Sequence, residues 1–260
     1  MRGWYYPGRF FVKVIPVTGY SGSGKTTFIC SLIPLLARYG PVGTVKHTGH
    51  HSMVIPEGKD TTVMFQAGAL AVTGIDEEKT LITTRSTSLT GALDILAMEG
   101  VAIVIVEGYK GSPIPKIIIG DLEAEGCVLR DPAPEDVTAV LDRFPDYISR
   151  EELLRALATG CRGRGKPCSL ASASVSLAAL PGEEPLSQVE KELPALVSRM
   201  EKLPGVAAAR AEIRRAALFG GPDEILVAVA AGTAEEAAGA LGAALSRCRE
   251  VLENLNPPGS

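Results

Sequence analysis

The stretch FFVKVIPVTGYSGSGKTT, residues 10–27, decides the fold. A run rich in β-branched residues ends at Gly19, a glycine-rich turn follows, and Lys25 and Thr26 open an apolar segment with helical spacing. The turn fits the pattern G-x-x-x-x-G-K-[ST], in which glycines let successive backbone N–H groups point at one anion while the helix start adds its positive dipole end. The sequence therefore predicts a strand, a phosphate-binding loop and a helix, in that order.

Three polar side chains, two in this stretch and one after a later strand, have expected roles. Lys25 would reach the β- and γ-phosphates of a nucleotide, and the Thr26 hydroxyl would ligate Mg²⁺. Such a site also needs a carboxylate at the end of a neighbouring strand, and Glu107 directly follows the apolar run AIVIV. We therefore expect Lys25 and Glu107 to act in catalysis, and Thr26 and Glu107 to hold the metal. The alternative for Glu107 is a solvated charge at a strand end.

All three histidines lie in the segment VKHTGHH, just past a predicted strand: His47, His50 and His51. This position is the carboxyl end of the sheet, where α/β folds bind ligands. Contact with an anion, a metal site and a partner surface all remain open for this cluster. Asp60 is a second candidate for polar work near the phosphates.

The order of apolar segments predicts two domains. Strands alternate with helices up to about Arg130, which predicts an α/β fold with a mostly parallel sheet covered on both faces. Beyond a Gly/Arg-rich stretch the order becomes strand, helix, strand, strand, helix, which is typical of a small α+β unit. We predict a P-loop domain over 1–158, a linker over 159–167 and an α+β domain over 168–260.

Composition excludes several classes of function. The chain has 260 residues, 46% of them hydrophobic, and a net charge of −4 with a pI near 5.5, which argues against a nucleic-acid partner. No apolar run approaches the roughly 20 residues that span a bilayer, and no convincing signal peptide opens the chain, so we expect no membrane partner. Five scattered cysteines indicate reduced thiols and a cytoplasmic protein. Cys161 and Cys168 are read as thiols flanking a basic linker, with a metal or redox site as the alternative.

Four motifs, in this order and spacing, carry a resemblance to a known family. GYSGSGKTT, VGTVKHTGHH, GKDTTVMFQAGA and VIVEGYKGSPIPKI resemble the molybdopterin-guanine dinucleotide biosynthesis protein B (MobB) family over about residues 12–130. The resemblance implies a P-loop nucleotide-binding fold, GTP and Mg²⁺ as cofactors, and at most weak GTPase activity. It also implies a MobA-like molybdopterin guanylyltransferase as partner, with molybdopterin or a molybdoenzyme as a further one. We expect a homodimer.

The resemblance also implies roles for individual residues, and the chain departs from the family in two places. The acidic residues usual after the histidines are replaced by SMVIPE, and the chain has no NKxD-type guanine motif, so the choice of guanine rests on the resemblance. Besides Gly19 of the loop motif and metal support from Glu107, the implied phosphate, ligand or partner contacts come from Gly22, Ser23, Gly24, Lys25, Thr26, Thr27, Lys46, His47, His50, Lys59, Asp60 and Lys110.

The C-terminal segment has a fainter resemblance to the second half of the molybdopterin synthase large subunit (MoaE) over roughly residues 170–252. Arg214 or Arg215, Glu224 and the strings VAVAA and AEEAAGA would match that family. The usual His-Arg before the helix and the terminal lysine-bearing stretch are missing. We therefore expect a non-catalytic copy used for docking or dimerisation. An Ala-rich α+β domain of no known relation is the alternative.

Three functions compete on this basis. The first is a GTP-binding accessory protein of molybdenum-cofactor maturation with slow hydrolysis, for which Arg85 is a candidate arginine finger. The second is a small-molecule kinase that uses ATP, with Arg162 to Lys166 as its arginine-bearing lid. The third is an adaptor that nucleotide stabilises without turnover.

Overall fold

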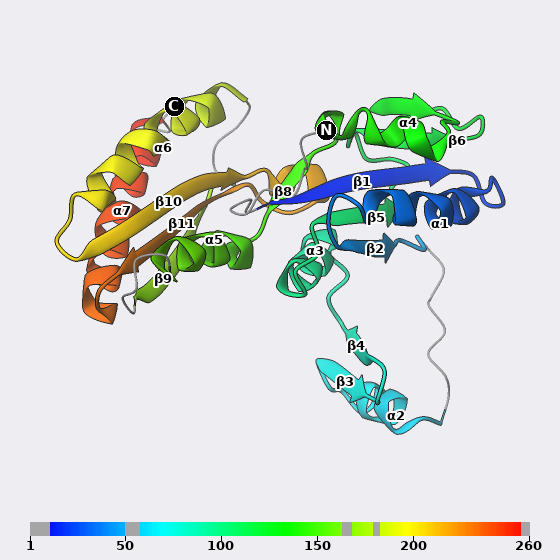
Figure 1. Ribbon diagram of the computed structural model, residues 1–260, viewed down its shortest axis with the longest axis horizontal. Coiled ribbons are helices and arrows are strands. Elements are labelled where there is room, and N and C mark those ends of the chain that lie inside the picture. The colour runs from blue at the N-terminus through cyan, green and yellow to red at the C-terminus, as the bar shows by residue number, and fades with distance from the viewer. Residues whose placement is uncertain (1–10, 50–57, 163–167, 179–182, 256–260) are drawn as a thin grey trace.

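A computed structural model describes residues 11–49, 58–162, 168–178 and 183–255, which form an elongated molecule of two packed units (Figure 1). The N-terminal unit is built on a six-stranded sheet. Five strands run parallel in the order β2-β5-β1-β6-β7, and β8 pairs antiparallel with β1. Their bounds are β1 Phe11–Gly19, β2 Val42–Lys46, β5 Ile103–Glu107, β6 Lys116–Ile119, β7 Cys127–Arg130 and β8 Asp146–Ile148.

Helices cover both faces of this sheet, so the predicted α/β fold with a mostly parallel sheet is confirmed. Ile15 and Val17 of β1 face α1, while Val12 and Val14 face α3, as the two-residue period of a strand requires. Pro34 lies within α1, near its end. The elements of the two faces are α1 (Lys25–Leu36), α4 (Pro134–Thr138) and a 3₁₀ turn (Leu141–Arg143) on one side, with α3 (Leu89–Met98) on the other.

A small excursion extends away from the sheet between β2 and α3 (Figure 1). It contains α2 (Asp60–Gln66) and an antiparallel hairpin of β3 (Ala71–Ile75) and β4 (Thr80–Thr84). We call residues 60–84 the arm. Several large apolar side chains of the arm are exposed, led by Ile75 at 79% and Leu70 at 75%.

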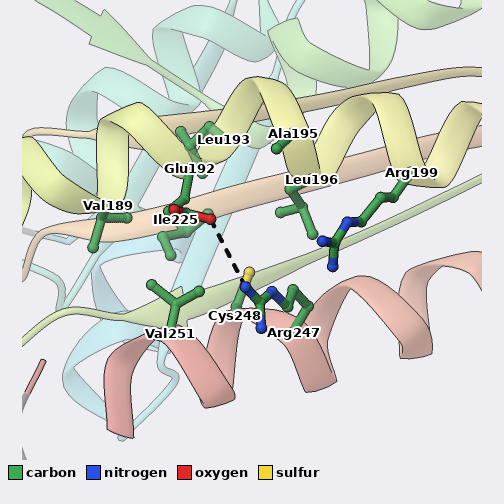
Figure 2. A pocket seen from close by; sticks show the side chains of 10 residues that line it. All are labelled: Val189, Glu192, Leu193, Ala195, Leu196, Arg199, Ile225, Arg247, Cys248 and Val251. Atoms are coloured by element: carbon green, nitrogen blue, oxygen red, sulfur yellow. Dashed lines mark ion pairs between the residues drawn. The ribbon is translucent and has the colours of Figure 1, made fainter. Parts of the chain in front are cut away.

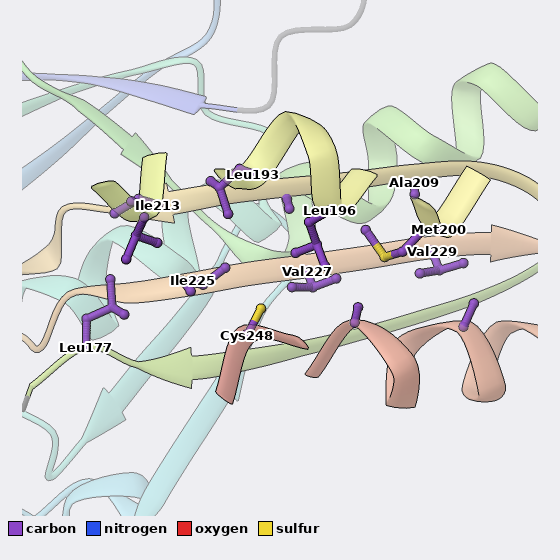
Figure 3. Close-up of a cluster of buried hydrophobic side chains, with 14 of the residues drawn as sticks. Leu177, Leu193, Leu196, Met200, Ala209, Ile213, Ile225, Val227, Val229 and Cys248 are labelled. Atoms are coloured by element: carbon purple, nitrogen blue, oxygen red, sulfur yellow. The ribbon is translucent and has the colours of Figure 1, made fainter. Parts of the chain in front are cut away.

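The C-terminal unit has the predicted order of strand, helix, strand, strand and helix. Its antiparallel sheet has the order β10-β11-β9, and α6 and α7 cover one face. Leu193, Leu196 and Met200 of α6 pack against Val227 and its neighbours on β11 (Figure 3). The elements are β9 (Ser169–Ser176), α6 (Glu183–Glu201), β10 (Val206–Arg214), β11 (Glu224–Ala231) and α7 (Ala234–Leu255), with a 3₁₀ turn at Ala216–Phe219.

Helix α5 (Arg150–Arg162) covers the opposite face of the C-terminal sheet. Residues 159–162, expected at the start of a linker, instead form the last turn of this helix, and 163–167 lie outside the described residues. The helix continues because Leu153, Leu157 and Cys161, spaced by four, all pack against the flat Ala-rich strand β11.

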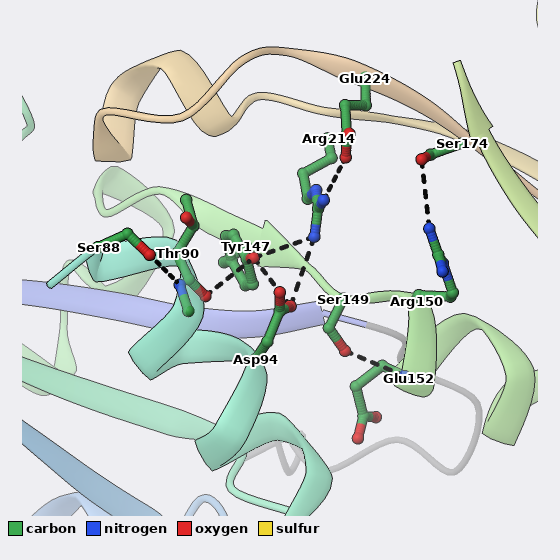
Figure 4. A network of polar contacts seen from close by, with 11 residues as sticks. Ser88, Thr90, Asp94, Tyr147, Ser149, Arg150, Glu152, Ser174, Arg214 and Glu224 are labelled. Carbon is green, nitrogen blue, oxygen red and sulfur yellow. Dashed lines mark hydrogen bonds and ion pairs between the residues drawn. The ribbon is translucent and has the colours of Figure 1, made fainter. Parts of the chain in front are cut away.

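Polar contacts join the two units beside β8 (Figure 4). Arg214 of β10 forms an ion pair with Glu224, and donates hydrogen bonds to Asp94 of α3 at 3.4 Å and to the Tyr147 hydroxyl at 3.1 Å. That hydroxyl donates to Asp94 at 2.9 Å. Burial and the Asp94 charge raise the pKa of Tyr147 far above its ordinary value, so it stays a neutral donor. Phe219 packs edge-on against the Tyr147 ring, at 5.5 Å between centroids.

Two further features are the polarity of the helices and the state of the cysteines. Over the described ranges, each helix is too short or too polar to cross a bilayer. None of the five cysteines, all of which are described, forms a disulfide.

We predict that Arg214→Leu weakens the junction between the units. The change removes the partner of the largely buried Glu224 carboxylate and should lower the free energy of unfolding by about 2–3 kcal/mol. Urea unfolding followed by circular dichroism measures this. Arg247→Leu is the control, because its ion pairs with Glu250 and Glu192 are exposed and should change the midpoint of unfolding little. Equal losses in the two variants would contradict this role of the junction.

Candidate functional site

The P-loop, residues 19–27, joins β1 to α1 with the backbone that its glycines permit. A Cβ at Gly19 would lie 2.3 Å from the carbonyl oxygen of Ile119, so the close approach of β6 requires glycine there. Gly22 and Gly24 have φ of 77° and 87°, in the left-handed region. The loop therefore turns tightly into α1, which begins at Lys25.

At the start of α1, backbone N–H groups have no side-chain hydrogen-bond acceptor nearby. Gly24 precedes the helix without a side-chain cap, and no acidic residue lies in the first turn. The buried hydroxyls of Thr18 and Ser23 likewise have no hydrogen-bond partner among the described residues. A polyanion such as a phosphate group fits this cradle, because it would accept bonds from the N–H groups and from the Ser23 hydroxyl.

Lys25 lies in the loop at 9% exposure, and its ammonium donates to the Tyr20 carbonyl at 2.5 Å. Burial lowers its pKa, because desolvation disfavours the charged form. The Glu107 carboxylate opposes this shift, whereas the charges of Lys110 and Lys46 add to it. Lys25, Lys46 and Lys110 thus share the site with the single carboxylate of Glu107, and the site has an excess of positive charge.

Strand pairing brings Glu107 to the P-loop. Glu107 is opposite Val17 of β1 on one side and Lys46 of β2 on the other. Its carboxylate accepts a hydrogen bond from the Thr26 hydroxyl at 3.4 Å and forms an ion pair with Lys46 at 3.5 Å. A carboxylate beside a hydroxyl is an oxygen donor set that suits Mg²⁺, which keeps its other positions for phosphate and water.

Glu107 and Thr26 are only two donors. The part of the chain that the structure describes contains no group of three or more His, Cys, Asp or Glu side chains that could hold a metal.

An aromatic stack closes the same edge of the sheet. The His47 ring lies on the Tyr109 ring with 4.2 Å between centroids, and the backbone N–H of His47 donates to the Glu107 carbonyl at 2.8 Å. Gly108 allows this approach, since a Cβ there would lie 2.8 Å from the His47 carbonyl oxygen. Lys110 extends over the Tyr20 ring at 5.3 Å.

The structure separates the remaining predicted site residues from this cluster. Lys59 and Asp60 lie at the start of α2, and Arg85 follows the arm and donates to carbonyls of Phe65 and Ala69. Figure 1 shows α2 and its hairpin well away from the P-loop. Those brought together are the loop residues, Glu107, Lys46, His47 and Lys110, with Thr27 exposed in the first turn of α1; His50 and His51 lie outside the described residues.

Sequence reasoning missed three residues of the site. Tyr20 and Tyr109 contribute its aromatic rings, and Lys116 lies buried beneath the turn that carries Tyr109. The motif strings contain all three, but single tyrosines and a lysine before an apolar run give no signal of what they contact.

A hollow lies between α6 and α7 in the C-terminal unit (Figure 2). Apolar side chains such as Leu193, Leu196 and Val251 line it, and Arg247 and Glu192 form an ion pair 3.9 Å long at its side. These apolar residues belong to the core of the unit, so the hollow is separate from the P-loop site.

Comparisons with known proteins point to one family. The model of the family described as molybdopterin guanine dinucleotide synthesis protein B matches residues 14–142. A molybdopterin-guanine dinucleotide biosynthesis adapter protein of Haemophilus influenzae is 39% identical over 147 residues, covering 54% of this chain and 79% of that protein. A probable adapter protein of Bacillus subtilis is 33% identical over 148 residues, covering 54% and 81%. The crystal structure of Bacillus subtilis MobB has a TM-score of 0.40 and 24% identity, covering 51% of this chain and 98% of that one.

We predict that Gly108→Ala disturbs the site from within. Gly108 has φ of 120°, which a side chain disfavours, and its new methyl group would meet His47. The expected loss is about 2 kcal/mol or more of unfolding free energy, measured by urea denaturation. Gly111→Ala in the same loop has open space around its Cβ and should change the midpoint little. A wild-type midpoint for Gly108→Ala would refute this account of the turn.

Proposed function

The chain belongs to the family of molybdopterin guanine dinucleotide synthesis protein B, and from this premise we propose that it is a GTP-binding adapter of molybdopterin guanine dinucleotide biosynthesis. In this role it presents the nucleotide to a partner guanylyltransferase and hydrolyses GTP weakly. The observation that carries the proposal is a P-loop whose lysine and hydroxyl meet a carboxylate at the end of β5.

Nucleotide binding is supported by the cradle at the start of α1. Backbone N–H groups of the loop and first turn, the Ser23 hydroxyl and the Lys25 ammonium would hold the phosphates. Lys46 and Lys110 would add attraction for the same charge. Guanine as the base follows from the family and not from a contact.

Magnesium would be held by Thr26 and Glu107. When bound, Mg²⁺ neutralises charge on the β- and γ-phosphates. The Thr26 hydroxyl would supply one oxygen, and Glu107 would supply a carboxylate that the ion pair with Lys46 orients.

Weak hydrolysis fits the rest of the site. Efficient GTP hydrolysis needs a group that orients water, often a glutamine, and an arginine that stabilises the transition state. The only glutamines of the sequence are Gln66 in α2 and Gln188 in α6, neither of which belongs to the P-loop, β5 or β6. Arg85 is bound to carbonyls of the arm. An adapter requires a site that binds GTP without hydrolysing it quickly.

The proposed partners are a MobA-like guanylyltransferase and molybdopterin or a molybdoenzyme. The name adapter, printed for the relatives, supports association with such proteins. The exposed Lys46, His47 and Lys110 beside the P-loop are the residues we assign to that contact, and the C-terminal unit would provide a second docking surface.

Five cysteines without a disulfide agree with a cytoplasmic location.

We further infer a homodimer formed through the arm. A two-stranded hairpin is marginal alone, and this one displays apolar side chains on a separate excursion. A second copy of the chain would bury them and extend the pairing of the hairpin edges. The exposed apolar residues are Val63, Met64, Leu70, Ile75, Leu81 and Ile82.

Calorimetric titration with Mg²⁺ and non-hydrolysable analogues of GTP and ATP tests nucleotide choice. We expect binding of the GTP analogue with a clear preference over ATP, and a dissociation constant for Lys25→Ala raised about 10- to 100-fold because a charge-assisted contact is lost. Lys79→Ala is the control, since Lys79 pairs with Asp76 on the exposed arm. Its affinity should equal that of the wild type.

Other outcomes of this titration have definite meanings. Equal or tighter binding of the ATP analogue would replace the adapter with an ATP-dependent small-molecule kinase. An unchanged dissociation constant in Lys25→Ala would remove the P-loop assignment altogether.

Sedimentation tests the dimer. The double variant Ile75→Ser, Leu81→Ser should sediment as a monomer while the wild type sediments as a dimer, because two exposed apolar contacts are lost. Leu203→Ser, an exposed leucine of the C-terminal unit, should leave the mass unchanged. A monomeric wild type, or a dimeric double variant, would contradict this interface.

A further inference from the structure

Lys116 is a buried cation beneath the turn that follows Glu107. It opens β6 at 1% exposure, and its ammonium donates to the Ser112 carbonyl and to the Tyr109 carbonyl, the latter at 3.5 Å. Within the described residues, both of its hydrogen-bond partners are backbone carbonyls. Lys13 of β1 is nearly as buried but bonds a carboxylate, Asp146, at 2.6 Å. Burying an ammonium on neutral acceptors is costly, so the contact indicates a specific task.

The two carbonyls belong to the turn that follows Glu107. The Ser112 N–H closes this turn on the Tyr109 carbonyl at 3.2 Å, so Lys116 bonds the inner side of a structure that is already tight. Tyr109 has φ of 53°, a left-handed conformation that a residue with a side chain adopts at a cost. The ammonium offsets this cost, because it bonds both carbonyls at once.

The two side chains at the start of the turn contact the end of β2 and the P-loop. Tyr109 stacks on His47 at the end of β2, and Lys110 lies over the ring of Tyr20, whose carbonyl receives the Lys25 ammonium. The charge of Lys110 is close enough to lower the pKa of Lys25. A shift of the turn would therefore move a ring and a charge at the edge of the phosphate cradle.

We propose that Lys116 is a positioning residue of the nucleotide site, which holds the 109–112 turn so that Tyr109 stays stacked on His47 and Lys110 reaches the P-loop. The inference rests on the proposed nucleotide binding. Lys116 contacts no phosphate itself; it acts through Lys110. Burial lowers the pKa of Lys116, and the charge of Glu125 partly opposes that shift.

A double-mutant cycle on the full chain tests this role, with Mg²⁺ and a non-hydrolysable GTP analogue as the probe. Lys116→Met should raise the dissociation constant about tenfold, and Lys110→Ala should raise it by a similar factor. The double variant should bind within about twofold of either single variant, because both changes remove the same contribution. Simple loss of stability would not produce this coupling.

Lys13→Met is the matched control. It removes the other buried lysine of the same sheet, at the end of β1 far from the P-loop, and should lower the melting temperature while leaving the dissociation constant within about twofold of the wild-type value. If Lys116→Met does not fold, Lys116→Gln, which keeps donors for the carbonyls without the charge, enters the same cycle. The expected rise is then at least about threefold, again without further loss on adding Lys110→Ala.

The outcomes separate this inference from the proposed function. A wild type that binds no nucleotide overturns both. A wild type that binds, combined with unaltered affinity in the Lys116 variant or with additive losses in the double variant, overturns the positioning role alone.

Discussion

The parallel pairing of β1 with β5 is the interaction on which the candidate site depends. Its register places Val17 opposite Glu107, two residues before the P-loop begins, and β2 on the other side of β5 places Lys46 opposite the same carboxylate. Backbone hydrogen bonds thus place Glu107 between a lysine and the phosphate cradle. A slip of one residue would turn Ile15 and Val17 away from α1, so burial of both faces fixes the register and with it the site.

The length of β1 extends this control to the C-terminal unit. β6 pairs with its last three residues and β8 with its first three, both on the same edge. The strand therefore carries the P-loop at one end and Tyr147 of β8 at the other, where Arg214 of the second sheet joins it. Helix α3 supplies Asp94 to this junction and leads into β5. The two units share a continuous packed framework, which a flexible tether would not provide.

The position of motifs with short spacings was predictable, and contacts created by packing were not. The P-loop is predicted by residues 19–27, and the place of Glu107 at a strand end by the apolar run directly before it, while their roles in binding and catalysis stay predictions. β8 is three residues long and has no period to detect. The linker was expected from the Gly/Arg-rich composition of residues 159–167, which does not show that the last turn of α5 packs against β11. In the sequence, Lys116 looks like the exposed start of a strand, because nothing there shows that the 109–112 turn covers it.

The same packing bears on how an adapter would use its nucleotide. A site that must fold around its ligand has its affinity reduced by the fraction of molecules in the competent state. Here the contacts of Gly108 and Lys116 that fix the turn beside the P-loop are all made within the chain itself. Binding energy is then available for the phosphates, and the exposed Lys110 and His47 are held where bound nucleotide and a partner protein would meet. In the proposed adapter, a site held in this way would favour presentation of GTP over its consumption.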